Sequence, residues 1–200
     1  MIIYLHGFRS SPHSTKAQLL AQAMGERGLE NDWACPQLPA SPAQAVALVH
    51  GLIEKAQEGG QQADRTLTLI GSSLGGYYAA CLAARWNCRA VLLNPVVYGA
   101  RDLATQVGTH TQYHSDQPFV FLPGYVQELA EMAEDRPTHP ENYFLLVTTG
   151  DEVLNWRETA QWYAGCPSRI VSGSDHGISD FSHWLPEVLE FALRPPITQL

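Results

Sequence analysis

The chain has 200 residues, enough for one well-buried domain, and its 45% hydrophobic and 16% charged residues are typical of globular proteins. Its formal net charge is −8, with 12 lysines and arginines and no basic run, which argues against nucleic acid and anionic membrane surfaces as partners. Since no apolar run approaches about 18 residues, we expect no membrane span.

Six short segments are predicted as strands, and most of them are continuous apolar runs, as expected for a parallel sheet that is covered on both faces. The predicted strands are Ile2–Leu5, Asp32–Pro36, Leu67–Ile70, Ala90–Asn94, Phe144–Thr148 and Arg169–Ser172.

Helical patterns alternate with these strands. The predicted helices are Thr15–Arg27, Ser41–Gln57, Gly75–Trp86, Trp156–Ala164 and Phe181–Leu193. Strand-helix alternation of this kind predicts a three-layer α/β fold with a doubly wound, mostly parallel six-stranded sheet. We expect residues 1–200 to form a single domain.

The connection between Asn94 and Tyr143 is longer than one crossover helix needs. It carries an amphipathic stretch, Tyr125–Ala133, and many aromatic residues. Long inserts in compact domains are usually functional, so we expect residues 98–142 to form a helical, lid-like insert. An ordinary helical excursion that extends the core is the alternative.

The segment Gly71-Ser72-Ser73-Leu74-Gly75 follows a predicted strand and leads into a predicted helix. A nucleophile elbow needs this context, because its serine sits on a strained strand-to-helix turn and the flanking glycines allow the turn to close. We therefore predict Ser73 as a catalytic nucleophile.

A serine nucleophile needs a general base and a carboxylate that orients the base. His176 lies in a polar loop between the last predicted strand and the last helix, where catalytic groups of open α/β sheets are found. Asp151 follows the strand Phe144–Thr148 and fits the chain order Ser, Asp, His. We predict Asp151 as the acid, with Glu152 as the second choice.

Acyl transfer also needs two backbone donors for the oxyanion. The amide of Leu74 follows the nucleophile, and the amide of Phe8 lies in the loop after the first strand. His6 in that loop is expected to be structural. We expect Gly7, Tyr77 and Tyr98 to contact the substrate.

Other constellations are weak. His110 and His114 have the helical spacing of a metal-binding pair, but no acidic residue lies between them and no further ligands cluster nearby. Chance is therefore the better explanation of their spacing, and we expect no metal. Lys16 and Arg9 could meet an anionic group, but ordinary surface charge is the default. No phosphate-binding glycine motif occurs, and no cofactor is expected.

The cysteines and the N-terminus bear on location. The cysteines are scattered without a CxxC pair, which favours free thiols in a reducing compartment. The first residues, Met1-Ile2-Ile3-Tyr4, lack the features of a signal peptide. We expect a cytoplasmic protein.

These motifs resemble the α/β-hydrolase superfamily and, more narrowly, the small bacterial YqiA-like esterases. The resemblance is carried by Tyr4-Leu5-His6-Gly7-Phe8, Pro36-Gln37-Leu38-Pro39, Gly71-Ser72-Ser73-Leu74-Gly75-Gly76-Tyr77-Tyr78, Asn94-Pro95, Thr149-Gly150-Asp151-Glu152 and Asp175-His176-Gly177. It implies a triad of Ser73, Asp151 and His176, strand order 2-1-3-4-5-6, and hydrolysis of esters or thioesters, including acyl-CoA-type substrates. Tyr98 stands where the family commonly has arginine.

The resulting hypothesis is a serine hydrolase that cleaves carboxylic esters or thioesters of small to medium acyl groups through an acyl-enzyme. Its partner is a small-molecule substrate. A non-catalytic binding protein of the same fold, and an acyltransferase or peptidase using the same triad, are the alternatives. The sequence leaves the oligomeric state open.

Overall fold

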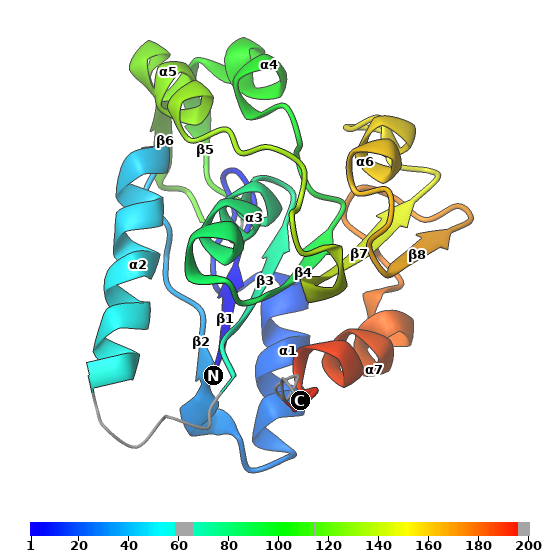
Figure 1. The fold of residues 1–200 in the computed structure, drawn as a ribbon. Coiled ribbons are helices and arrows are strands. Elements are labelled where there is room, and N and C mark those ends of the chain that lie inside the picture. Colours follow the sequence, from blue (N-terminus) through cyan, green and yellow to red (C-terminus); the bar gives the residue numbers. More distant parts are fainter. Residues whose placement is uncertain (59–65, 114, 196–200) are drawn as a thin grey trace.

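A six-stranded parallel sheet forms the centre of the molecule (Figure 1). The structure is a computed structural model that describes residues 1–58, 66–113 and 115–195. The strands of the sheet are β1 (Ile2–Leu5), β2 (Trp33–Ala34), β3 (Thr68–Ser72), β4 (Arg89–Leu93), β7 (Tyr143–Thr148) and β8 (Ser168–Val171). Their order, β2-β1-β3-β4-β7-β8, is the predicted 2-1-3-4-5-6 for the six strands of this sheet. Strand β2 is shorter than predicted.

The central strands separate two hydrophobic cores. Leu69 of β3 and Leu92 of β4 belong to one core, whereas their chain neighbours Ile70 and Val91 belong to the other. Alternate residues of a strand point to opposite faces, so a strand covered on both sides needs a continuous apolar run. This requirement explains why the sequence pattern located these strands well.

Helices cover both faces of the sheet and complete the predicted three layers. Figure 1 shows α1 (Thr15–Gly25) and α7 (Phe181–Ala192) side by side, and both contribute to the core that contains Ile70. The other face is covered by α2 (Pro42–Glu58), α3 (Leu74–Trp86) and α6 (Trp156–Trp162). A short 3-10 helix, η1 (Glu30–Asp32), precedes β2.

The insert between β4 and β7 is not wholly helical, contrary to the prediction. Its elements are α4 (Gly99–Leu103), the 3-10 helix η2 (Ala104–Gln106), an antiparallel hairpin of β5 (Gly108–Thr111) and β6 (Pro118–Phe121), α5 (Pro123–Glu131) and the 3-10 helix η3 (Pro140–Asn142). In β6, Phe119 and Phe121 are buried and Val120 is exposed. This alternation is what a half-buried hairpin requires.

Helix α5 ties the insert to the body of the domain. The Glu128 carboxylate accepts hydrogen bonds from the Ser41 hydroxyl at 2.7 Å and the Ala43 amide at 2.9 Å, at the start of α2. A carboxylate there satisfies otherwise unpaired amides and interacts favourably with the helix dipole.

Two further observations concern the chain as a whole. None of the helices in the described ranges is long and apolar enough to cross a membrane. Cys35, Cys81, Cys88 and Cys166 all carry free thiols.

Candidate active site

Ser73 occupies a strained turn between β3 and α3. Its backbone has φ 56° and ψ −123°, a region that residues other than glycine rarely adopt. Neighbouring segments hold this conformation, since the Ser73 amide donates to the Leu93 carbonyl at 3.0 Å and the Val96 amide donates to the Ser73 carbonyl at 3.1 Å. The end of β4 thus fixes the turn.

The two glycines of the elbow are required by close backbone approaches. A Cβ at Gly71 would lie 2.2 Å from the Gly75 carbonyl oxygen, and a Cβ at Gly75 would lie 2.0 Å from the Leu5 carbonyl oxygen. Only a residue without a side chain fits at either position.

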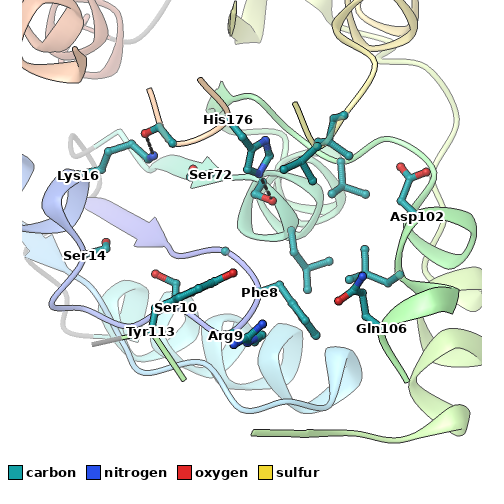
Figure 2. A pocket seen from close by; sticks show the side chains of 18 of the residues that line it. Phe8, Arg9, Ser10, Ser14, Lys16, Ser72, Asp102, Gln106, Tyr113 and His176 are labelled. Carbon is teal, nitrogen blue, oxygen red and sulfur yellow. Dashed lines mark hydrogen bonds between the residues drawn. The ribbon is translucent and has the colours of Figure 1, made fainter. Parts of the chain in front are cut away.

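Ser73, His176 and Asp151 form one hydrogen-bonded chain. His176 Nε2 lies 2.9 Å from Ser73 Oγ, and His176 Nδ1 lies 2.8 Å from Asp151 Oδ2. A carboxylate can only accept, so Nδ1 carries the proton and the Ser73 hydroxyl donates to Nε2. A dashed line marks the hydrogen bond at His176 in Figure 2. These three residues are the ones that the sequence predicted as a triad.

Asp151 is held in its ionised form. Burial alone would raise the pKa of this carboxyl, since its side chain is 2% exposed. Hydrogen bonds from His176 and from the amides of Leu154 and Val153 outweigh burial, so the pKa lies below its usual value. The two amides donate to Asp151 Oδ1 at 2.8 and 2.9 Å. The acid therefore carries a negative charge that faces the imidazole.

Glu152, the second choice for the acid, lies in a different position. Its Oε2 accepts a hydrogen bond from the backbone amide of His176 at 2.9 Å and does not contact the ring. Glu152 thus holds the histidine loop, whereas Asp151 holds the imidazole.

Asn94 is a site residue that the sequence analysis did not assign. It is 2% exposed with φ 42°, and its Nδ2 donates to Thr148 Oγ1 at 3.0 Å and to the carbonyls of Asp175 and His176 at 3.3 and 3.1 Å. Its Oδ1 accepts from the Thr148 amide at 2.9 Å. A polar residue at the end of a buried strand, next to Pro95, was the available signal. Asn94 joins the ends of β4 and β7 to the histidine loop.

The loop after β1 lies against the elbow. A Cβ at Gly7 would meet Ser73 Cβ at 3.2 Å, so Gly7 allows the loop to approach the nucleophile. The amides of Phe8 and Leu74, the predicted oxyanion donors, donate no hydrogen bond to other groups in the described part of the chain. Both residues line the cavity described below.

His6 anchors this loop, in line with its expected structural role. The Leu38 amide donates to His6 Nε2 at 3.0 Å, which leaves the Nδ1 proton to donate to the Gly7 carbonyl at 3.0 Å. Burial lowers the pKa of this imidazole, so the ring is kept neutral.

A cavity of about 480 Å³ opens above Ser73 (Figure 2). Its apolar part is lined by Phe8, Leu74, Val96, Leu103, Val153 and Leu154. In Figure 2, Asp102 and Gln106 lie on one side of Phe8, and Ser10, Ser14 and Lys16 lie on the opposite side.

Tyr77 and Tyr98 do not line this cavity, so the prediction that they contact the substrate is wrong for the pocket above Ser73. Tyr77 lies on the face of α3 that packs against α5, and its hydroxyl donates to the Leu129 carbonyl at 2.8 Å. Tyr98 is exposed and packs on Trp162 and Arg101. Helix direction decided the outcome for Tyr77, because neighbouring residues of α3 point to different sides, whereas Tyr98 precedes α4 in a non-helical conformation.

The two weak constellations had different outcomes. His110 lies on β5 and not on a helix, so helical spacing does not apply to it, and His114 lies outside the described residues. Among the described residues, no group of three or more His, Cys, Asp or Glu side chains is placed to hold a metal ion. Lys16 and Arg9 are not ordinary surface charges, because both line the cavity.

Solved structures with the same fold are esterases and related hydrolases. Est1E from Butyrivibrio proteoclasticus with bound ferulic acid matches with a TM-score of 0.70 at 12% identity, covering 96% of this chain and 87% of that chain. A putative hydrolase from Agrobacterium vitis S4 matches with a TM-score of 0.72 at 13% identity over the same shares. Mouse alpha/beta hydrolase domain-containing protein 10 matches with a TM-score of 0.66 at 15% identity, covering 94% of this chain and 89% of that chain.

The sheet order, the three layers and these structural matches define an α/β-hydrolase fold, as the sequence predicted. The model of an uncharacterised protein family, UPF0227, matches residues 1–193. The chain belongs to this family.

Proposed function

We propose that this protein is a serine hydrolase that cleaves carboxylic esters or thioesters. The single observation that supports this proposal most strongly is the hydrogen-bonded chain from Ser73 through His176 to Asp151. Three side chains from separate segments meet at hydrogen-bond distance, and two of them, Ser73 and His176, line the cavity. This geometry activates a serine hydroxyl.

The first half of the reaction forms the acyl-enzyme. His176 Nε2 takes the hydroxyl proton as Ser73 Oγ attacks the acyl carbon, and the carbonyl oxygen becomes an oxyanion held by the amides of Phe8 and Leu74. The bond to the leaving group then breaks, and His176 gives its proton to the departing alcohol or thiol. Asp151 keeps the imidazole in the required tautomer and stabilises its charged form.

The second half returns the enzyme to its starting state. Water loses a proton to His176 and attacks the acyl carbon, after which Ser73 leaves with that proton and the carboxylic acid is released. The His176 side chain is 18% exposed, so water reaches the base.

The apolar part of the cavity supports a small to medium acyl group. Its aliphatic and aromatic lining gains free energy by removing acyl methylenes from water, about 0.8 kcal/mol for each. We include residues 98–142 in this proposal as an insert within one domain that shapes the acyl pocket through Leu103 and Gln106.

Labelling and turnover test this function together. Wild type and Ser73→Ala are treated with a fluorophosphonate probe and with p-nitrophenyl esters from acetate to octanoate. We expect wild type to react with both and Ser73→Ala with neither. A wild type that neither labels nor hydrolyses would favour a non-catalytic binding protein, and turnover retained in Ser73→Ala would exclude Ser73 as the nucleophile. Amide cleavage or transfer to an added alcohol would favour a peptidase or acyltransferase.

A further inference from the structure

Two cations line the Ser73 cavity without a carboxylate partner. Lys16 Nζ donates to the carbonyl of Gly177, and Arg9 Nε donates to the carbonyl of Thr111 at 2.8 Å. In the described ranges neither forms an ion pair with an Asp or Glu side chain. By contrast, Arg101 and Arg169 each pair with a glutamate at 2.8 Å. Lys16 is thus influenced only by the more distant charge of Asp175, and Arg9 lies over the Tyr113 ring, 4.6 Å from its centroid. Within a chain of net charge −8, both cations lie at this cavity without an ion pair among the described residues.

The position of Lys16 disfavours its charge. Burial lowers the pKa of its ammonium to about 8, while the charge of Asp175 acts in the opposite direction. A half-buried cation costs free energy unless an anion or several acceptors compensate it. One carbonyl satisfies only one of the three donors of Nζ. An anionic ligand would supply the missing acceptors.

The neighbours of Lys16 offer further donors. Ser14 Oγ is buried at the cavity, where its neighbour is the Tyr4 hydroxyl, and it makes no close hydrogen bond in the described part of the chain. Ser14 is the N-cap residue of α1, but its side chain does not cap that helix. In Figure 2, Ser14, Ser10 and Lys16 lie on one side of His176 and Phe8. We call the set Arg9, Ser10, Ser14 and Lys16 the polar lobe.

The polar lobe and the apolar part differ in charge. Among the described residues that line the cavity, Asp102 is the one carboxylate, and it lies across from the polar lobe and pairs with Arg101 at 2.7 Å. The polar lobe therefore presents donors and positive charge and no lining carboxylate. Such a surface suits oxygen anions and is unfavourable for an alkyl chain.

We propose that the polar lobe binds a carboxylate or phosphate carried by the leaving group of the substrate. This inference rests on the proposed function. Lys16 contacts Gly177, the residue after His176, and His176 is the group that would protonate the leaving alcohol or thiol. The acyl group then occupies the apolar part, and the released alcohol or thiol bears the anion. The substrate class is an anionic ester or thioester.

Matched esters test the polar lobe by turnover. The probes are 3-acetoxybenzoate, its neutral methyl ester and 3-acetoxyphenyl phosphate, and the measured quantity is the ratio of kcat/KM for each anionic ester to that for the neutral one. Intrinsic reactivity of the esters cancels when this ratio is compared between variants. Lys16→Met is compared with Lys16→Arg, which keeps the charge, and with Lys55→Met, which removes an exposed lysine of α2.

We expect the ratio to fall about tenfold or more in Lys16→Met, as for the loss of one charge-assisted hydrogen bond. Lys16→Arg should keep most of the ratio, and Lys55→Met should leave it unchanged. The ester with the larger fall identifies carboxylate or phosphate as the preferred anion. An unchanged ratio in a Lys16→Met protein that labels normally with the fluorophosphonate would overturn the proposal.

A binding measurement separates this inference from the proposed function. The affinity of 3-hydroxybenzoate and of inorganic phosphate is measured by calorimetry for Ser73→Ala, with and without Lys16→Met. Weaker binding of either probe after loss of Lys16 supports the anion site even if wild type hydrolyses nothing. If neither probe binds, and wild type hydrolyses the neutral ester as fast as the anionic ones, the anion site is wrong and the hydrolase function stands.

Discussion

Gly75 and Gly51 provide a matched test of the close approach at the elbow. Both lie within helices, Gly75 in α3 and Gly51 in α2. A Cβ at Gly51 meets nothing within 4 Å, whereas a Cβ at Gly75 would lie 2.0 Å from the Leu5 carbonyl oxygen and 2.6 Å from that of His6. The same Gly→Ala substitution should therefore have opposite effects at the two positions.

The magnitudes follow from helix propensity and from overlap. Gly51→Ala should stabilise the protein by about 0.5–1 kcal/mol, because alanine loses less conformational freedom in a helix. At Gly75 this gain in helix propensity is outweighed by steric overlap. Ordinary van der Waals contact begins at 3.4 Å, so the Leu5 carbonyl oxygen and the new Cβ would have to move apart by about 1.4 Å. Overpacking typically costs about 1–3 kcal/mol, and we expect at least about 3 kcal/mol because the obstruction is backbone.

Urea unfolding of the two variants and wild type, followed by circular dichroism, measures these free energies. In thermal unfolding, each kcal/mol corresponds to a shift of about 2–4 °C in Tm for a chain of this size. We also expect folded Gly75→Ala to lose esterase activity, since the substitution would displace the His6–Phe8 loop from Ser73. A Gly75→Ala protein as stable as Gly51→Ala would refute the close approach of α3 to β1.

Three further predictions concern the triad. In p-nitrophenyl acetate turnover, Asp151→Asn should lower kcat/KM by about 10³-fold or more, because an amide does not fix the productive His176 tautomer. Glu152→Gln should lower kcat/KM by less than about tenfold, since it alters only a hydrogen bond to the His176 backbone. Ser73→Gly should be more stable than Ser73→Ala by about 1 kcal/mol in urea unfolding, because the relief of about 1–3 kcal/mol of backbone strain exceeds the entropic cost of ordering a glycine. Equal stabilities of the two variants would mean that the turn is unstrained. Because the folded protein lowers the pKa of Asp151, the ionised carboxylate stabilises the fold fully above the unfolded pKa of about 3.9, and this stabilisation is lost as the pH falls through the lower folded pKa. The stability difference between wild type and Asp151→Asn should therefore shrink below about pH 4, and a difference that grows there would contradict the assignment.

The sequence predicted the sheet and the triad because both depend on local patterns. Buried parallel strands need continuous apolar runs, and Ser73 and Asp151 each follow a strand end that such a run marks. His176 follows β8, a mostly exposed strand, and was located by its polar loop before the last helix and by the chain order Ser, Asp, His. The hairpin in the insert was missed because Gly108–Thr111 is short and largely polar, and its burial depends on partners distant in sequence. Lys16 was undervalued for the same reason, since its partner Gly177 lies near the other end of the chain.

The hairpin is fastened to the loop that carries the proposed oxyanion amide. The Phe8 ring packs edge-on against Phe119 and Phe121 of β6, with ring centroids 5.0 and 5.3 Å apart. The Tyr113 amide donates to the Arg9 carbonyl at 2.7 Å. The insert that we propose as part of the acyl pocket thus also holds the loop that carries the Phe8 amide. Substrate preference and catalytic rate are therefore mechanically linked, and substitutions that remodel this pocket for a new acyl group should change kcat as well as KM.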